Sequence, residues 1–341
     1  AVEEVGLFYP PDPASQEYSS IGGNVSENAG GMRAAKYGIT KDYVMATRAV
    51  LPNGDIIKAG KRTIKDVAGY NISGILIASE GTLAVLSEIT LRLIPKPKHT
   101  KTAMGIFNSV HDAMNAVYKT MASGITPVAM EFLDNLTIRA VEQTFKKGLP
   151  IDAGALLVTD VDGNLEEDLN YQLAQIEKVF FENGCSEFKI AKDDKEAKDI
   201  WFARRNASPA LSVYGSKKLN EDVTVPRAAL PELLERFYAI ADKYNIKIPC
   251  FGHTGDGNVH TNVMVDGKDP EQVKIAYQAI EEVFQATIDL GGTLSGEHGI
   301  GLAKAPYMRM AFTDEEMNLF KSIKKAFDPN NILNPAKMGL N

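Results

Sequence analysis

Three of the five histidines in this 341-residue chain lie in two glycine-rich segments. The first segment, residues 251–260, contains His253 and His260, and the second contains the neighbours Glu297 and His298. Imidazole and carboxylate are the usual protein ligands of a borderline divalent cation, and nearby glycines let the backbone approach a small ligand closely. The combination predicts a metal-assisted active site. The alternative is that hydrogen bonds satisfy these histidines in loops whose glycines only make turns.

The spacing predicts how the residues of the first segment could meet. Residues 259–265 alternate like a strand that leaves a turn, so His260 and Asn262 would point to one face. A run of turn residues follows His253 and can bring it back beside His260. Because Glu297 and His298 are adjacent in the sequence, their side chains would point in different directions. One could then bind a metal while the other faces the reacting substrate.

Hydrophobic periodicity and turn residues predict the elements that must position these side chains. The predicted strands are 44–50, 56–58, 75–78, 83–93, 102–107, 128–133, 155–160, 188–191, 223–225, 248–251 and 259–265. The predicted helices are 110–122, 165–183, 193–211, 230–245, 270–290 and 313–327, and the last begins with a capping-box pattern. Residues 21–24 and 28–31 are expected to be loops that cradle a ligand. The chain is therefore predicted to be of the α+β class.

Composition limits the classes of partner. The formal net charge of −7 and the lack of a basic tract argue against nucleic acid. No run of about 18 apolar residues occurs, so no membrane span is expected. Two cysteines, Cys185 and Cys250, lack metal-type spacing and predict a reducing, cytoplasmic compartment without a disulfide framework.

Several motifs together resemble the FAD-dependent D-2-hydroxyacid dehydrogenases of the vanillyl-alcohol-oxidase superfamily, the group that contains D-lactate dehydrogenase and the glycolate oxidase catalytic subunit. The motifs are residues 21–24, 27–31, 66–70, 79–83, the two histidine-bearing segments and 334–337. The resemblance covers essentially the whole chain.

The resemblance implies a vanillyl-alcohol-oxidase-type FAD-binding domain, an α+β cap domain with an antiparallel sheet, and a C-terminal helical segment. Residues 1–98 would form the C-terminal part of the FAD-binding domain, and 99–295 the substrate or cap domain. Residues 296–341 would return to the flavin. The family's usual N-terminal piece, a glycine-rich pyrophosphate loop with its strands, is expected to be absent from this chain, so that the FAD-binding domain is truncated.

FAD is the cofactor that the resemblance implies. The residues expected to lie against it are Gly22, Gly23, Asn28, Gly30, Gly31, Glu80, Gly81, Thr82, Ile89 and Asn334. Main-chain N–H groups in glycine turns are good partners for a diphosphate. The alternative is that the glycine pairs only make tight turns.

The resemblance also implies a divalent metal, which could be zinc, manganese or iron, and a set of catalytic residues. The expected metal ligands are His253, His260 and Glu297, and the expected catalytic residues are His298, Arg204 and Asn262. His298 would act as the general base, while Arg204 and Asn262 would contact the substrate. The alternative for Arg204 is a salt bridge on the helix surface, because Glu196 lies on the same helix.

The implied reaction is the metal-assisted oxidation of a small D-2-hydroxy acid, D-lactate or glycolate, to the 2-oxo acid, with hydride passing to flavin N5. Asn220 stands where some relatives have a substrate-binding lysine, which argues against a dicarboxylate substrate. Electrons would leave through an electron-transfer flavoprotein, an iron–sulfur subunit or a small acceptor, and a homodimer is left open. The alternatives are another flavin oxidase of the same superfamily, or a non-catalytic or FAD-deficient fragment or subunit.

Overall fold

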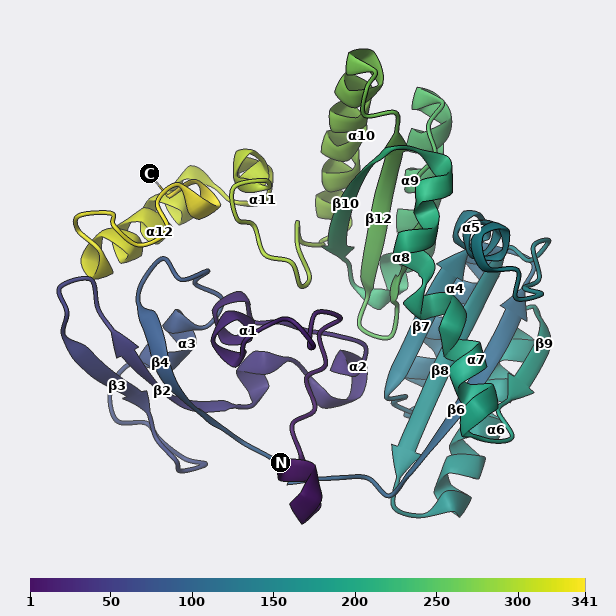
Figure 1. Ribbon diagram of the computed structural model, residues 1–341, viewed down its shortest axis with the longest axis horizontal. Coiled ribbons are helices and arrows are strands. Elements are labelled where there is room, and N and C mark those ends of the chain that lie inside the picture. The colour runs from purple at the N-terminus through teal and green to yellow at the C-terminus, as the bar shows by residue number, and fades with distance from the viewer. Residues whose placement is uncertain (341) are drawn as a thin grey trace. The chain divides into compact units, whose positions relative to one another are not determined.

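The computed structural model describes residues 1–340, which divide into two compact units. The terminal unit comprises Ala1–Arg33, Tyr37–Lys96 and the chain from Leu294 onward, and the central unit comprises Ala34–Lys36 and Pro97–Thr293. The central unit has one sheet, and the terminal unit has a three-stranded sheet and the two-stranded pair of residues 7–8 and 94–95; helices pack on the larger sheet of each unit (Figure 1).

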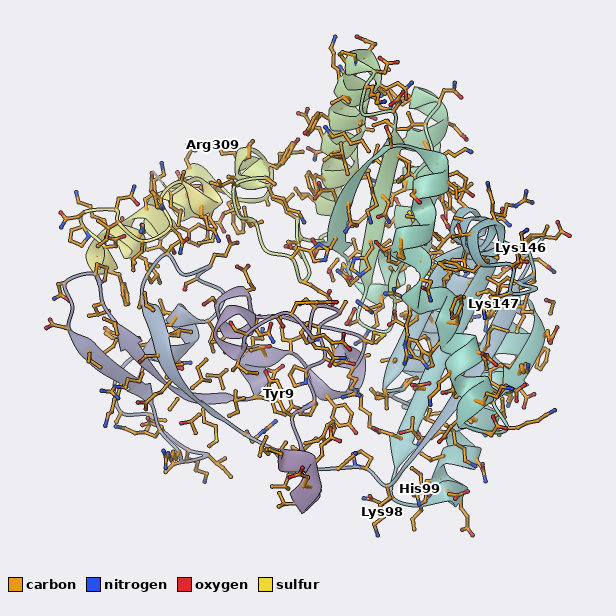
Figure 2. All side chains as sticks on the ribbon, viewed as in Figure 1. Tyr9, Lys98, His99, Lys146, Lys147 and Arg309 are labelled. Atoms are coloured by element: carbon orange, nitrogen blue, oxygen red, sulfur yellow. The ribbon has the colours of Figure 1, made fainter. Side chains whose placement is uncertain are left out.

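The central unit is built on a seven-stranded sheet with the order β10-β12-β11-β7-β8-β6-β9. Every neighbouring pair is antiparallel, as the sequence predicts for this part of the chain. The strands are β6 (His99–Phe107), β7 (Ala129–Asp134), β8 (Ala155–Gly163), β9 (Cys185–Ile190), β10 (Lys217–Thr224), β11 (Cys250–His253) and β12 (Asn258–Val265). Figure 2 labels His99, where β6 begins.

Helices cover both faces of this sheet (Figure 1). One layer contains α4 (Val110–Ala122), α6 (Glu166–Glu182), α9 (Leu230–Tyr244) and α10 (Pro270–Asp289). The other contains α5 (Asn135–Phe145), α7 (Asp194–Arg205) and α8 (Ala207–Ala210). Leu133, Leu156 and Phe251 point from the strands into the core under the second layer. Because side chains alternate along a strand, Glu131 and His253 share that face.

The terminal unit contains a three-stranded antiparallel sheet with the order β3-β2-β4. Its larger elements are β2 (Val44–Val50), β3 (Ile56–Gly60), β4 (Val85–Leu91), α3 (Ile72–Leu76) and α12 (Asp314–Phe327). The smaller ones are β1 (Leu7–Phe8), β5 (Ile94–Pro95), α1 (Ile21–Glu27) and α11 (Met308–Ala311), while α2 (Ala34–Tyr37) is divided between the two units. Ile323 and Phe327 of α12 pack on the core of this sheet, so the C-terminal helix returns to the first part of the chain as predicted.

Most predicted elements are present, and α4 has the predicted bounds, but two predictions were wrong, one helix was missed, and the predicted helix 193–211 is divided into α7 and α8 at Asn206. Residues 21–24 form helix α1 instead of a loop, because Ser20 caps the helix and Asn24 and Val25 are buried. The apolar run at 75–78 ends a short capped helix, α3, rather than forming a strand. Helix α5 was missed because its N-cap, Asp134, is also the last residue of β7, so no separate turn marks its start.

Among residues 1–340, none of the helices combines the length and low polarity needed to cross a membrane. Cys185 and Cys250 are both buried and free.

Candidate functional site

His253 and His260 meet in the central unit. They lie on the adjacent strands β11 and β12, joined by a turn at 254–257, and their Nε2 atoms are 3.4 Å apart. Both rings are buried, with exposed fractions of 4% and 7%, and they meet edge to face. The turn therefore returns the chain as its spacing predicts, and it leaves two imidazole nitrogens facing each other in the interior.

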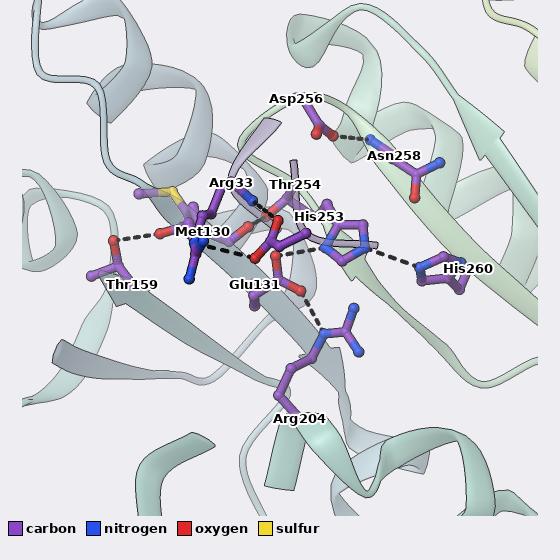
Figure 3. A network of polar contacts seen from close by, with 12 residues as sticks. Arg33, Met130, Glu131, Thr159, Arg204, His253, Thr254, Asp256, Asn258 and His260 are labelled. Atoms are coloured by element: carbon purple, nitrogen blue, oxygen red, sulfur yellow. Dashed lines mark hydrogen bonds and ion pairs between the residues drawn. The ribbon is translucent and has the colours of Figure 1, made fainter. Parts of the chain in front are cut away.

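Glu131, on β7, is the partner of His253 on its other side (Figure 3). Its Oε1 lies 2.7 Å from His253 Nδ1, and its Oε2 accepts a hydrogen bond of 2.6 Å from Arg204 Nε. The side chain is fully buried, which raises the pKa of the carboxyl, but His253 and Arg204 outweigh burial and hold the pKa below its usual value. Glu131 is therefore an ionised carboxylate shared by a histidine and an arginine.

The bond to Glu131 fixes the chemistry of the His253 ring. A carboxylate only accepts hydrogen bonds, so His253 must carry a proton on Nδ1. In the neutral ring this leaves the Nε2 lone pair directed toward His260. Two nitrogens bound to a tetrahedral zinc ion at ~2.05 Å lie about 3.3 Å apart, close to the observed separation of 3.4 Å. The histidine pair therefore fits a divalent cation in both donor type and spacing.

Arg204 lies in the interior rather than on the surface of α7. Its side chain is 10% exposed, and its guanidinium lies 4.9 Å from the centre of the Phe251 ring. The alternative of a surface salt bridge with Glu196 is wrong, because Glu196 pairs with Lys189 at 2.6 Å. Since Arg204 Nε is bonded to Glu131, its two terminal nitrogens are the end that can grip another anion.

Asn262 lies two residues beyond His260 on the same face of β12. Its Nδ2 donates to the main-chain oxygens of Pro249 and His260, whereas its Oδ1 is buried and has no partner among residues 1–340. Asn220 lies directly opposite on β10, and its Oδ1 is likewise buried without a hydrogen-bond partner among the described residues. A buried acceptor without a donor costs free energy, so these two oxygens suit a ligand or a water that donates hydrogen bonds.

Glu297 and His298 belong to the terminal unit, in the coil before α11. Glu297 is half-buried beside Gly30, where an added Cβ would come within 3.3 Å of the Glu297 carboxylate. His298 is exposed. The metal-ligand role of Glu297 and the general-base role of His298 stay predictions.

Glu80 holds the turn that follows His298. Its carboxylate accepts hydrogen bonds from Ile300 N at 2.6 Å and from Gly301 N at 2.8 Å. Glu27 lies nearby, and burial together with the charge of Glu80 raises the pKa of Glu27. The Glu80 side chain is therefore used within the protein, so a contact to a cofactor at this position would have to come from its main chain.

The remaining predicted cofactor residues lie in the terminal unit. Gly22 and Gly23 are in α1, Gly30 and Gly31 are in coil, and Ile89 is on β4.

The turn at 80–82 is tied to two other parts of this unit. Glu80 N donates to Ser26 O at the end of α1, and Asn334 Nδ2 donates to Gly81 O. The hydroxyl of Thr82 is buried and donates to Ser79 O.

A cavity of about 990 Å³ lies within the terminal unit and includes Asn28 in its wall. Four basic side chains line it: Lys41, Lys58, Lys61 and Arg92. Asp42 and Asp66 line it as well, and of the ten predicted cofactor residues Asn28 alone lies in its wall. The excess of basic over acidic side chains and the size of the cavity suit a large anionic cofactor such as a dinucleotide.

The sequence missed Glu131, which contacts two of the predicted site residues, His253 and Arg204. The available signal was a single acidic residue inside the apolar run at 128–133, which was predicted as a buried strand. A lone charge in a buried strand needs a partner.

Comparison with known proteins gives consistent results for both parts of the chain. Residues 96–338 match the C-terminal domain of FAD linked oxidases, and residues 1–60 match an FAD binding domain. The chain is 42% identical to the glycolate oxidase subunit GlcD of Bacillus subtilis (strain 168) over 338 residues, which are 99% of this chain and 72% of that protein. It is 35% identical to a D-lactate dehydrogenase of Anaerostipes hadrus over 347 residues, 98% of this chain and 72% of that protein.

Solved structures share the fold at low sequence identity. A substrate-bound p-cresol methylhydroxylase has a TM-score of 0.78 at 16% identity, over 100% of this chain and 73% of that one. An alkyldihydroxyacetonephosphate synthase has a TM-score of 0.70 at 18% identity, and this chain spans 61% of its length. The fold is therefore of the vanillyl-alcohol-oxidase type, as the sequence predicts.

Proposed function

The chain belongs to the FAD-linked oxidase family, and on that premise we propose that it oxidises a small D-2-hydroxy acid to the 2-oxo acid. The substrate gives up its hydroxyl proton and its α-hydrogen, and the α-hydrogen leaves with two electrons. Glycolate and D-lactate are the first candidates, since the relatives above carry these names. The observation that carries the proposal is the buried histidine pair next to a buried arginine, which suits a cation site beside a carboxylate site.

The cofactor of this reaction is FAD, and its binding is supported by the cavity of the terminal unit, whose wall has more basic than acidic side chains. When bound, FAD supplies the acceptor for the α-hydrogen and the two electrons. The chain contributes the cavity wall, the turn at 80–82 and the coil at 28–31.

His253 and His260 are the proposed ligands of a zinc, manganese or iron ion, with Glu297 as the third. When bound, the cation supplies Lewis acidity that lowers the pKa of the substrate hydroxyl. The support is the donor chemistry of the three side chains, together with the 3.4 Å between the two imidazole nitrogens.

Three side chains act on the substrate in this proposal. The terminal nitrogens of Arg204 bind the carboxylate through two parallel hydrogen bonds, because Nε is already engaged. Asn262 contacts the substrate, and its buried Oδ1 accepts a hydrogen bond from the hydroxyl of the bound substrate until that proton is removed, or from a water. His298 takes the hydroxyl proton near neutral pH, as an imidazole is suited to do.

Asn220 favours a small substrate with one carboxylate. It stands opposite Asn262 and offers an amide, which gives no positive charge for a second carboxylate. Electrons leave through a partner subunit, such as an iron–sulfur protein or an electron-transfer flavoprotein, or through a small acceptor. The name of the GlcD relatives, a subunit of glycolate oxidase, supports the first route.

A substrate screen with an artificial dye acceptor tests the proposal. Purified chain supplied with FAD and Zn²⁺ or Mn²⁺ is expected to reduce the dye with D-lactate or glycolate, and much more slowly with L-lactate or D-2-hydroxyglutarate. Dye reduction with 4-alkylphenols alone would favour another flavin oxidase of the superfamily. Failure to retain FAD would favour a non-catalytic or FAD-deficient fragment or subunit.

A further inference from the structure

We propose that Glu131 is a positioning residue shared by both halves of the site. One carboxylate would set the ring of the metal ligand His253 and also the guanidinium of the substrate-binding Arg204. The inference rests on the proposed function for the roles of those two residues, while the contacts that support it belong to the central unit alone.

The contacts use both oxygens of the carboxylate. Oε1 accepts from His253 Nδ1 at 2.7 Å and Oε2 accepts from Arg204 Nε at 2.6 Å (Figure 3). Glu131 is fully buried, and its Cα is paired in register with that of His253 across β7 and β11. The sheet therefore fixes the spacing of the carboxylate and the ring, and α7 brings in the arginine from the covering layer.

The geometry has a chemical consequence at each end. At His253, the carboxylate fixes the tautomer with the proton on Nδ1, so that Nε2 is the ligand atom and faces His260 Nε2. At Arg204, it holds Nε and leaves the terminal nitrogens as the end that meets the substrate. A glutamine at this position has one acceptor oxygen, so it can satisfy His253 or Arg204 but not both.

A purely structural role would give a different result. Breaking a buried ion pair lowers stability wherever the pair lies. Asp134 is a suitable control, because it is a buried carboxylate on the same strand that accepts from Cys250 N and Thr137 N but contacts neither His253 nor Arg204. Glu131→Gln and Asp134→Asn should both destabilise the chain, whereas only Glu131→Gln should change the site.

The experiment compares the full chain with Glu131→Gln, Asp134→Asn and Arg204→Lys. Zn²⁺ is titrated into metal-depleted protein against a chromophoric chelator. Loss of such an outer carboxylate typically costs 10- to 100-fold in metal affinity, so Glu131→Gln is expected to bind Zn²⁺ weaker by that factor. Asp134→Asn and Arg204→Lys should stay within about threefold of the parent chain. For the hydroxy acid, Glu131→Gln and Arg204→Lys should both raise KM.

Nitrogen-15 NMR of selectively labelled histidines in the metal-free chain gives a second reading, which needs neither activity nor a variant that folds. The ring of His253 is expected to carry its proton on Nδ1. A proton on Nε2 in the parent chain, or Zn²⁺ affinity unchanged in Glu131→Gln, would overturn the inference even if hydroxy acids are oxidised. If no hydroxy acid is oxidised but the tautomer and the Zn²⁺ affinity respond as expected, the proposed function fails and the positioning of His253 stands.

Discussion

Replacement of Glu80 by glutamine should loosen the turn that follows His298. The Glu80 carboxylate accepts from the main-chain N–H groups of Ile300 and Gly301 at 2.6 and 2.8 Å, and its side chain is buried. A hydrogen bond to a charged group contributes about 1.5–3 kcal/mol. Glutamine keeps one acceptor oxygen and turns an NH₂ group toward the other N–H, so at least one of the two bonds is lost.

A loss of about 2 kcal/mol corresponds to a factor of about 30 in the local opening equilibrium, because 1.4 kcal/mol is tenfold. Amide hydrogen exchange of Ile300 and Gly301, followed by mass spectrometry, should therefore become about 30-fold faster in Glu80→Gln. The control is Glu88→Gln, whose carboxylate pairs with Arg48 on the exposed side of the three-stranded sheet. The control should leave exchange at 300–301 unchanged.

The result bears on catalysis as well as on structure. If His298 is the base, a less ordered turn should lower kcat more than it raises KM, because the base is then correctly placed for a smaller fraction of the time. Exchange at Ile300 and Gly301 that stays within threefold of the parent chain in Glu80→Gln would show that the two hydrogen bonds contribute little to the order of this turn.

Two further predictions concern the stability of the chain, one at a glycine and one at a buried carboxyl group. Gly299 and Gly291 both have a left-handed backbone, with φ +77° and +75°, but an added Cβ would meet the carboxylates of Glu27 and Glu80 at Gly299 and open space at Gly291. Because Glu80 is fixed by its bonds to Ile300 and Gly301, Gly299→Ala should lower the free energy of unfolding in urea by about 1 kcal/mol more than Gly291→Ala, and equal losses would contradict the clash. Burial raises the pKa of Asp134 from 3.8 to about 6, so the native state holds the proton more tightly than the unfolded chain does. Its contribution to stability is complete below pH 4 and is lost as the pH rises through 6, a change of about 3 kcal/mol at 1.36 kcal/mol per unit. The stability of the parent chain relative to Asp134→Asn should fall by about 2 kcal/mol of this total between pH 4 and pH 7 in urea titrations, because the unfolded carboxyl is already more than half ionised at pH 4. A difference that does not vary with pH would contradict the raised pKa.

The sequence predicted elements well where periodicity and end signals agree. Helix α4 has the predicted bounds, and the capping box that begins α12 is present at Thr313 and Glu316. The prediction failed at α3 and α1, where short apolar or glycine-rich stretches become helical because tertiary burial and a capping side chain outweigh local propensity.

The contacts within the candidate site could also be predicted only where they depend on local sequence. Local spacing was enough to bring His253 beside His260, since one short turn joins their strands. Glu131 and Arg204 come from separate elements, and their pairing with His253 depends on the order of strands in the sheet and on the packing of α7. Sequence periodicity fixes neither of these, so a charge on a buried strand could be noticed but its partner could not be named.

In the proposed function, the buried histidine pair binds a cation on which hydroxy acid oxidation depends. The most direct test of this dependence is anaerobic mixing of D-lactate or glycolate with the FAD-loaded chain, with flavin reduction followed in a single turnover before and after metal removal by a chelator. We expect metal removal to slow flavin reduction by at least 100-fold, on the order of what the loss of a Lewis acid costs, and Zn²⁺ or Mn²⁺ to restore the rate in the parent chain but not in His260→Ala. Reduction at an unchanged rate in the metal-free chain would contradict this dependence.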